Sequence, residues 1–498
     1  MITLLVLGFA LWSAPPSPPT CDPMDAAKCI ADIGALAGSS QKLIWSWVGS
    51  APARSSEEGR PRLTFESQGP SGILVTPDIN DVLGKWIIFS TESRLTSGEL
   101  IGPRFDIVAN ANWRFEEPDA AHPICTSEDG GWQKCNVALY VPQSSTRVYL
   151  TVGGKGAFQI RSLHLEIRDG TQMGAVASTD RAAFEHASGI MQKKFFKTDV
   201  VNWATLESES APWLASPGHN GGELAVAWLA FRLPSHGHTR VIETKVSGAD
   251  ASGASLSARE GPRAGSGPIG RMPLGKLGSD RLGYLRLPTT PGPFDNAAHV
   301  VYWRQAQREI LDIAAHGAHD WVIDLRGNEG GSIFTLLASL APLIGVRHDL
   351  GAFKSRTGNA QWFGIQQKGV VLDNELVAPV VLTQHIERPG TITLLVDQHC
   401  ASSCEMLASV LAPLPNVRVA GLPTTGVPTG NGVEAVTAAY AIELTEYVLV
   451  LPSGKEVDGP IRPNYLLTDD ELRTFEQLSG PIRQKLTLED AEKSTRSP

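Results

Sequence analysis

Residues 394–414 read Leu-Leu-Val-Asp-Gln-His-Cys-Ala-Ser-Ser-Cys-Glu-Met-Leu-Ala-Ser-Val-Leu-Ala-Pro-Leu, and this stretch predicts a strand that leads directly into a helix. The apolar, β-rich run at residues 391–396 is typical of a buried strand, and apolar residues recur at helical spacing from Glu405 onward. Ser402 and Ser403 therefore fall at the start of the helix, beside backbone N–H groups without an intrahelical partner. Such groups can stabilise the oxyanion of acyl transfer, so a serine here is a candidate nucleophile. The alternative is a helix cap, because serine is a favoured N-cap residue.

Two further stretches favour the nucleophile. Residues 324–331 read Asp-Leu-Arg-Gly-Asn-Glu-Gly-Gly and follow the strand-like run 321–323. Two adjacent glycines after a strand allow close approach of the backbone and an N–H group that points at a bound group. Residues 235–240 read Ser-His-Gly-His-Thr-Arg, and imidazole is the side chain best able to take and return a proton near neutral pH.

With these stretches, the chain resembles the S41 family of serine peptidases, of the tail-specific and tricorn-core type. The family pattern is a histidine before Thr or Ser, then Asp-x-Arg-x-Asn-x-Gly-Gly, Ala-Ser-x-x-Glu, Gly-x-x-Thr-x-Gly and x-Pro-Asp. The chain carries these elements in order, the last with Asn for Asp, over about residues 180–470, at His238-Thr239 and at residues 324–331, 401–405, 421–426 and 462–464. The resemblance implies that Ser402 is the nucleophile. It also implies an oxyanion hole made by the N–H of Ser403 and that of Gly330 or Gly331.

The resemblance leaves the general base to be chosen. One group of S41 enzymes uses a lysine directly after the Gly-x-x-Thr-x-Gly turn. That position is Val427 here, and valine cannot accept a proton. The other group uses Ser, His and a later Glu. His238 matches that histidine better than His236 does, because Thr239 follows it.

The third catalytic group should lie shortly before the x-Pro-Asp element, where the chain has Pro463-Asn464. Glu456 is the predicted acid that orients His238, and Asp458 is the alternative. His399, three residues before Ser402, is a rival base. Arg326 and Asn328 are expected to hold the shape of the glycine loop.

The length of 498 residues suggests two to four domains. The net charge of −9, without a basic cluster interleaved with aromatic residues, argues against nucleic acid as a partner.

Residues 1–20 are predicted to be a signal peptide, because an apolar run is followed by Pro-Pro-Ser-Pro-Pro. No later run is long and apolar enough to span a membrane. We therefore expect an exported protein, periplasmic or extracellular. No Cys/His set has zinc spacing, and neither a metal nor another cofactor is predicted.

Six cysteines fall into three close pairs, which read as disulfides in an exported chain. Cys125 and Cys135 form the best candidate pair, since they bracket a turn-rich segment. Cys21 and Cys29 come next. Cys400 and Cys404 flank the candidate nucleophile, and either a bridge or two buried thiols would fit there.

The chain is expected to be multidomain: an all-β sandwich, a helical segment and an α/β core. Its β-sandwich resembles jelly-roll carbohydrate-binding modules over residues 132–169, which implies a carbohydrate contact. Only 44 residues separate His238 from Gly283, too few for a peptide-binding PDZ domain of roughly 80 to 100 residues. For the core, the resemblance implies a ββα spiral of the crotonase and ClpP type. The expected segments are an N-terminal helical segment (21–59), the β-sandwich (60–170), the helical segment with the catalytic histidine (179–246), a linker (247–281), the core (282–484) and a polar tail (485–498).

These expectations converge on an exported serine endopeptidase that hydrolyses peptide bonds through an acyl-enzyme and acts on a peptide or protein substrate. The alternative is a non-catalytic ligand- or peptide-binding protein on the same fold, since retinoid-binding proteins of the eye resemble S41 cores. A third hypothesis is an adhesion or scaffold protein led by the β domain, although the catalytic motifs would then be idle. Labelling of Ser402 by a fluorophosphonate separates the first hypothesis from the other two.

Overall fold

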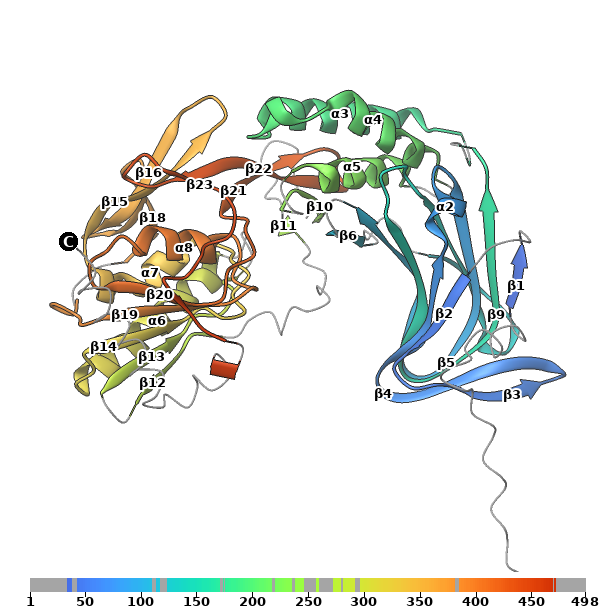
Figure 1. Cartoon of the computed structure of the whole chain (residues 1–498), viewed down its shortest axis with the longest axis horizontal. Coiled ribbons are helices and arrows are strands. Elements are labelled where there is room, and N and C mark those ends of the chain that lie inside the picture. Colours follow the sequence, from blue (N-terminus) through green and yellow to red (C-terminus); the bar gives the residue numbers. More distant parts are fainter. Residues whose placement is uncertain are drawn as a thin grey trace, which may run out of the picture. The chain divides into compact units, whose positions relative to one another are not determined.

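The computed structural model describes two compact units of the chain (Figure 1). The first contains residues up to Phe184 together with Ala204–Arg232, and the second contains Glu185–Trp203 and the residues from Leu233 onward. The described residues are 34–37, 43–109, 113–116, 123–170, 173, 175–216, 220–234, 238–245, 257–258, 272–278, 281–291, 296–380, 385–468 and 470–471. The predicted signal peptide, the pair Cys21 and Cys29, and the polar tail lie outside these residues.

The described strands of the first unit form one nine-stranded sheet with the order β2-β4-β9-β5-β8-β7. β1 pairs with β9, β3 with β4, and β6 with β5. β4, β5 and β9 are long, and register shifts interrupt their pairing, so these strands can bend along their length (Figure 1). The elements are β1 (Gly34–Ala37), β2 (Leu43–Val48), β3 (Ala53–Glu57), β4 (Arg60–Pro77), α2 (Ile79–Val82), β5 (Trp86–Ala109), β6 (Trp113–Glu116), β7 (Ile124–Ser127), β8 (Gln133–Tyr140) and β9 (Arg147–Arg168).

The start of this sheet corrects one prediction. A helix was expected in the segment 21–59, from about residue 26 to 47, but the described part of that segment contains β1, β2 and β3. β2 reads Leu-Ile-Trp-Ser-Trp-Val, and it pairs with β4 from Leu43↔Pro77 to Val48↔Gly72. Aromatic and β-branched residues fit a pleated, half-buried surface, and pairing with a distant strand outweighs local helical spacing.

Residues 204–232 complete the first unit rather than the second. Trp213 is fully buried, and its ring centroid lies 6.1 Å from that of Trp86 and 5.9 Å from that of Phe105. α5 (Gly221–Arg232) is buried at every residue from Gly221 to Phe231, as expected for a helix in which almost every residue is apolar. The predicted single helical segment 179–246 is therefore divided between the units, and His238 belongs to the second. The other helices here are α3 (Ser178–Lys194), η3 (Thr198–Val200), α4 (Trp203–Ser210) and η4 (Ala211–Ala215).

The second unit contains a six-stranded sheet of order β12-β13-β14-β19-β20-β24. Its strand pairs are parallel except that β12 runs antiparallel to β13. β12 lies within the segment predicted as a linker, so the sheet begins earlier than expected. The predicted alternation of strands and helices is confirmed in β13 (Leu282–Arg286), α6 (Asn296–Ala315), β14 (Asp320–Asp324), α7 (Ile333–Ile344), β19 (Ile392–Val396), α8 (Ser403–Leu411) and β20 (Val417–Gly421). The sheet also contains β12 (Leu274–Leu277) and β24 (Tyr465–Leu466).

A second sheet of this unit has the order β11-β10-β22-β15-β16-β17-β18, with β21 and β23 also paired to β22. α7 and α8 lie between the two sheets, and one hydrophobic core joins them through buried residues such as Leu337, Leu407 and Phe363 (Figure 1). The strands are β10 (Arg240–Lys245), β11 (Ser257–Ala258), β15 (Arg347–Ser355), β16 (Ala360–Gln366), β17 (Gly369–Leu372), β18 (Glu375–Pro379), β21 (Thr429–Ala435), β22 (Tyr440–Val450) and β23 (Glu456–Val457). The ββα spiral itself stays a prediction of the resemblance.

Within the described part of the chain, none of the helices combines the length and the apolar character that a membrane crossing requires.

Candidate active site

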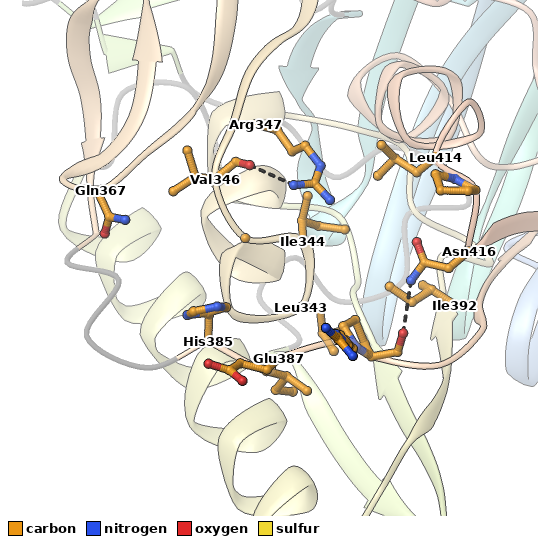
Figure 2. A pocket seen from close by; sticks show the side chains of 15 residues that line it. Leu343, Ile344, Val346, Arg347, Gln367, His385, Glu387, Ile392, Leu414 and Asn416 are labelled. Atoms are coloured by element: carbon orange, nitrogen blue, oxygen red, sulfur yellow. Dashed lines mark hydrogen bonds between the residues drawn. The ribbon is translucent and has the colours of Figure 1, made fainter.

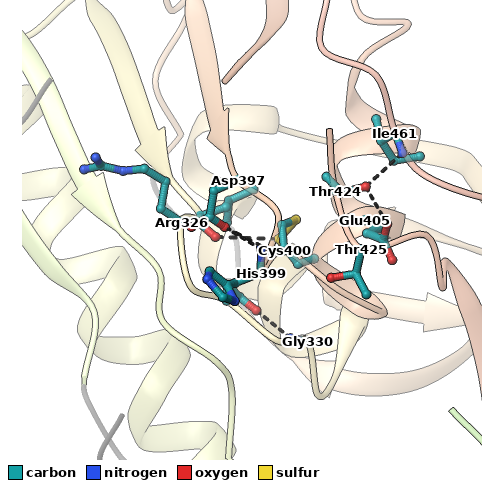
Figure 3. Close-up of a disulfide and its surroundings, with 12 residues drawn as sticks. Arg326, Gly330, Asp397, His399, Cys400, Glu405, Thr424, Thr425 and Ile461 are labelled. Carbon is teal, nitrogen blue, oxygen red and sulfur yellow. Dashed lines mark hydrogen bonds between the residues drawn. A yellow bond between two sulfur atoms is a disulfide. The ribbon is translucent and has the colours of Figure 1, made fainter. Parts of the chain in front are cut away.

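Ser402 lies at the turn between β19 and α8, where the sequence predicted it. All five residues of β19 are buried, and Asp397 follows the strand. Its Oδ1 accepts hydrogen bonds from the backbone N–H of His399, Cys400 and Gly327, which fixes the turn (Figure 3). Ser402 is the N-cap of α8 and has φ 55° and ψ −121°, a conformation that non-glycine residues seldom adopt. Backbone strain of this kind costs of order 1–3 kcal/mol and is concentrated at functional sites.

Ser403 differs from Ser402 in its surroundings. Its side chain is buried, with 5% of the residue exposed, and its hydroxyl donates a 2.7 Å hydrogen bond to the carbonyl of Gly331. That hydroxyl therefore holds the glycine loop against the start of α8. Ser402 is only half-buried, so the geometry favours Ser402 over Ser403 as a residue that meets a substrate.

The glycine loop after β14 is held by its own polar side chains. Asp324 is buried and binds the Arg326 guanidinium at 2.9 and 2.6 Å, and it accepts a hydrogen bond from Tyr284. Burial and the Asp324 carboxylate both raise the pKa of Tyr284. Asn328 is fully buried and donates to the carbonyls of Leu287 and Pro288. Arg326 and Asn328 thus shape the loop.

Gly330 lies directly against the candidate nucleophile. A Cβ atom at this glycine would stand 2.8 Å from the Cβ of Ser402 and 3.0 Å from the backbone nitrogen of Ser403. Its φ of 103° also disfavours any side chain. The absence of a Cβ at residue 330 therefore leaves the N–H of Ser403 accessible beside Ser402.

The two glycines differ as oxyanion donors. The N–H of Gly330 donates to Asn328 Oδ1 at 2.8 Å. No hydrogen bond from the N–H of Gly331 is found within the described residues, and Ser403, as the first residue of α8, has no intrahelical acceptor for its own N–H. Among the described contacts, the N–H groups of Ser403 and Gly331 therefore have no acceptor, whereas that of Gly330 has one.

The Glu405 carboxylate joins the start of α8 to the segment around Gly426 and Val427. Glu405 is fully buried, and its carboxylate accepts hydrogen bonds from the N–H of Ser402 (3.1 Å), Gly426 (2.7 Å) and Val427 (2.8 Å) and from the hydroxyl of Thr424 (2.5 Å). Figure 3 shows Glu405 beside Thr424. Burial raises the pKa of Glu405 above its ordinary value, against the opposing effect of these donors. The sequence motif contained Glu405 but gave no reason for it.

Glu405 also shows that Val427, which occupies the position of the lysine in one group of S41 enzymes, lies close to Ser402. The N–H groups of Ser402 and Val427 bind the same oxygen, Glu405 Oε2, so Val427 lies close to the candidate nucleophile. The family position of the lysine is thus beside Ser402 in space, and it carries an apolar, buried side chain here. A Ser–Lys pair is excluded at this position.

His238 precedes β10, and its Nδ1 lies 2.7 Å from Thr429 Oγ1 at the start of β21. Thr429 in turn donates its N–H to the carbonyl of Val427, the residue that shares Glu405 with Ser402. A fully extended residue spans at most about 3.6 Å, so Thr429 lies close to Val427. These contacts place His238 and Ser402 in the same region of the second unit. His236 lies outside the described residues.

The described contacts do not join Glu456, the predicted third catalytic residue, to His238. The Glu456 carboxylate binds Lys354 Nζ at 2.8 Å, and its side chain is 50% exposed. Asp458 binds Lys197 and is also exposed. Neither acid has a hydrogen bond to His238 among the described contacts. His399 is exposed and contacts the side chain of its neighbour Gln398.

Cys400 and Cys404 are joined by a disulfide that brackets Ser402 (Figure 3). Both cysteines are fully buried. The predicted bridge between Cys125 and Cys135 is confirmed as well, in the first unit. The bridge at the active-site turn links the end of the β19 turn to the first turn of α8.

We expect the Cys400→Ala/Cys404→Ala double variant to lose activity at a lower temperature than the wild type. A bridge that closes so short a loop contributes about 2 kcal/mol, which corresponds to about 4 to 8 °C in a unit of this size. The measurement is residual activity after heating. Cys125→Ala/Cys135→Ala is the matched control, and it should leave the inactivation temperature unchanged because that bridge lies in the other unit. Equal shifts in the two double variants would contradict the expectation.

Figure 2 shows a hollow of about 650 Å³. It is lined by Ile344 at the end of α7, Ile392 at the start of β19, and Arg347 and Arg388. Ser402 follows the opposite, carboxyl end of β19. The hollow is therefore not part of the site around Ser402.

A half-exposed serine at a strained strand-to-helix turn, with N–H donors beside it and a histidine linked to it through Thr429, Val427 and Glu405, is compatible with a serine hydrolase. Residues 281–467 match the model of peptidase family S41, and this match identifies them as a serine peptidase domain of that family. His238 lies outside the matched residues. Comparison with curated proteins gives no match.

Several solved structures resemble the chain. A lipoprotein from Streptococcus agalactiae is 15% identical with a TM-score of 0.45, over 61% of this chain and 96% of its own. The photosystem II D1 C-terminal processing protease is 14% identical with a TM-score of 0.37, over 59% and 94%. Mature CPAF complexed with lactacystin is 13% identical with a TM-score of 0.39, over 60% and 96%.

Proposed function

We propose that this chain is an exported serine endopeptidase in which Ser402 is the nucleophile and His238 the general base. One observation carries the proposal: Gly330 is packed against Ser402 and Ser403 so closely that only a glycine leaves the N–H of Ser403 accessible. Such an open N–H beside a strained serine suits acyl transfer and has no evident use in a helix cap alone.

In the proposed reaction, His238 takes the hydroxyl proton of Ser402 while the serine oxygen attacks the carbonyl carbon of a peptide bond. The carbonyl electron pair moves to oxygen, where the N–H groups of Ser403 and Gly331 stabilise the negative charge. Collapse of this intermediate breaks the C–N bond, and the proton passes from His238 to the leaving amine. Water then hydrolyses the acyl-enzyme by the same steps and restores Ser402.

The same proposal includes the compartment and the partners. Two disulfides support an oxidising, exported location, and the family supports a peptide or protein substrate. A carbohydrate contact through the β domain stays a prediction from the sequence.

A fluorophosphonate probe tests the proposal. The wild type should form a covalent phosphonyl adduct, with loss of fluoride, and peptide mapping should place it on Ser402. Ser402→Ala and heat-unfolded wild type are the controls, and both should remain unlabelled. A folded wild-type protein that does not react would favour the alternative, a non-catalytic binding protein on the same fold.

A further inference from the structure

His238 is fixed by a hydroxyl group rather than by the predicted acid. The distance from His238 Nδ1 to Thr429 Oγ1 is 2.7 Å, within hydrogen-bonding range. A neutral imidazole donates from one ring nitrogen and accepts at the other. When Nδ1–H donates to Thr429, Nε2 is left to accept the proton of Ser402, which is the tautomer that a general base requires.

Thr429 is itself held in place. It is buried, with 7% exposed, and its N–H donates to the carbonyl of Val427 at 2.7 Å. Val427 is bound through its own N–H to Glu405, which also binds the N–H of Ser402. Thr429 therefore links the histidine to the buried carboxylate that positions the nucleophile.

The carboxylate of Glu443 is connected to His238 through Asn431. Glu443 on β22 stands opposite Arg240 in the β10–β22 register, and Arg240 Nε contacts its Oε2 at 2.6 Å. Asn431 Nδ2 connects this carboxylate to the histidine, since it lies 3.4 Å from Glu443 Oε1 and 3.1 Å from the carbonyl of His238. Burial works against the anion, but Arg240, and after it His238, keep the pKa of Glu443 below its ordinary value.

We propose that Thr429 and Glu443 are the positioning residues of His238: Thr429 sets its tautomer, and the Glu443 carboxylate stabilises the charged ring. This inference rests on the proposed function and reassigns the role predicted for Glu456. Glu456 lies in an exposed ion pair, where solvent screens its charge. Glu443 lies in a network of Arg240, Asn431 and His238, where its charge is less screened.

Four variants test the inference through kcat/KM and its pH dependence. Thr429→Val removes the hydroxyl at nearly constant volume and should lower kcat/KM by about 10- to 100-fold, whereas Thr429→Ser should restore most of it. Glu443→Gln should lower kcat/KM and move the acid limb of the profile to lower pH, because the imidazolium loses a nearby anion. Glu456→Gln is the matched control and should behave as the wild type.

A second measurement does not depend on turnover. In a Ser402→Ala background, titration of the His238 ring by nuclear magnetic resonance should give a lower pKa when Glu443→Gln is added, and no change with Glu456→Gln. Wild-type behaviour of Thr429→Val and Glu443→Gln together with loss in Glu456→Gln would overturn the inference. Absence of fluorophosphonate labelling in the wild type would instead overturn the proposed function, so the two failures are distinguishable.

Discussion

Ser402→Ala is expected to lower kcat for peptide hydrolysis by about 10⁴- to 10⁶-fold, because it removes the only atom that can form the acyl-enzyme in the proposed mechanism. Ser403→Ala should cost far less. Its hydroxyl donates to the carbonyl of Gly331, so the variant loses one structural hydrogen bond of about 1 kcal/mol. The N–H of residue 403 remains available to the oxyanion.

Single-turnover kinetics with an activated ester separates the two serines. The wild type and Ser403→Ala should both release a burst of leaving group equal to the enzyme concentration, and Ser402→Ala should release none. Circular dichroism of each variant checks that the fold is retained. Equal losses in the two variants, or a larger loss in Ser403→Ala, would show that the nucleophile is misassigned.

The core elements of the second unit were predictable because their signals are local. α6, α7 and α8 carry apolar residues at helical spacing, and β14 and β19 are short apolar runs that end in polar residues. The segment around residues 26–47 was mispredicted because β2 depends on pairing with β4, from Leu43↔Pro77 to Val48↔Gly72, and this partner is not local in the chain. Likewise, nothing local reveals that Trp213 packs with Trp86 in the first unit.

Some residues of the candidate site could likewise be predicted from local sequence, and others could not. Ser402, the glycine loop and Glu405 occupy continuous motifs, so their places could be read from the sequence. The surroundings of His238 could not, since Thr429 lies 191 residues from it in the chain, and Glu443 is connected to it through Asn431 and through the pairing of β10 with β22. Glu456 was predicted from spacing alone. Spacing along the chain does not determine which strand faces which.

His238→Ala is expected to abolish acylation and turnover together, with a loss of about 10⁴- to 10⁶-fold in kcat, because the nucleophile then has no base. In the wild type, activity should fall on the acid side, since a protonated imidazole cannot accept the proton of Ser402. The measurement is kcat/KM from pH 4 to 9 together with the fluorophosphonate labelling rate. His399→Ala is the matched control: its ring is exposed and contacts Gln398, so both the rate and the profile should stay unchanged. An active His238→Ala enzyme that keeps the same acid limb would remove the Ser–His mechanism, and a loss confined to His399→Ala would transfer the role of base to that residue.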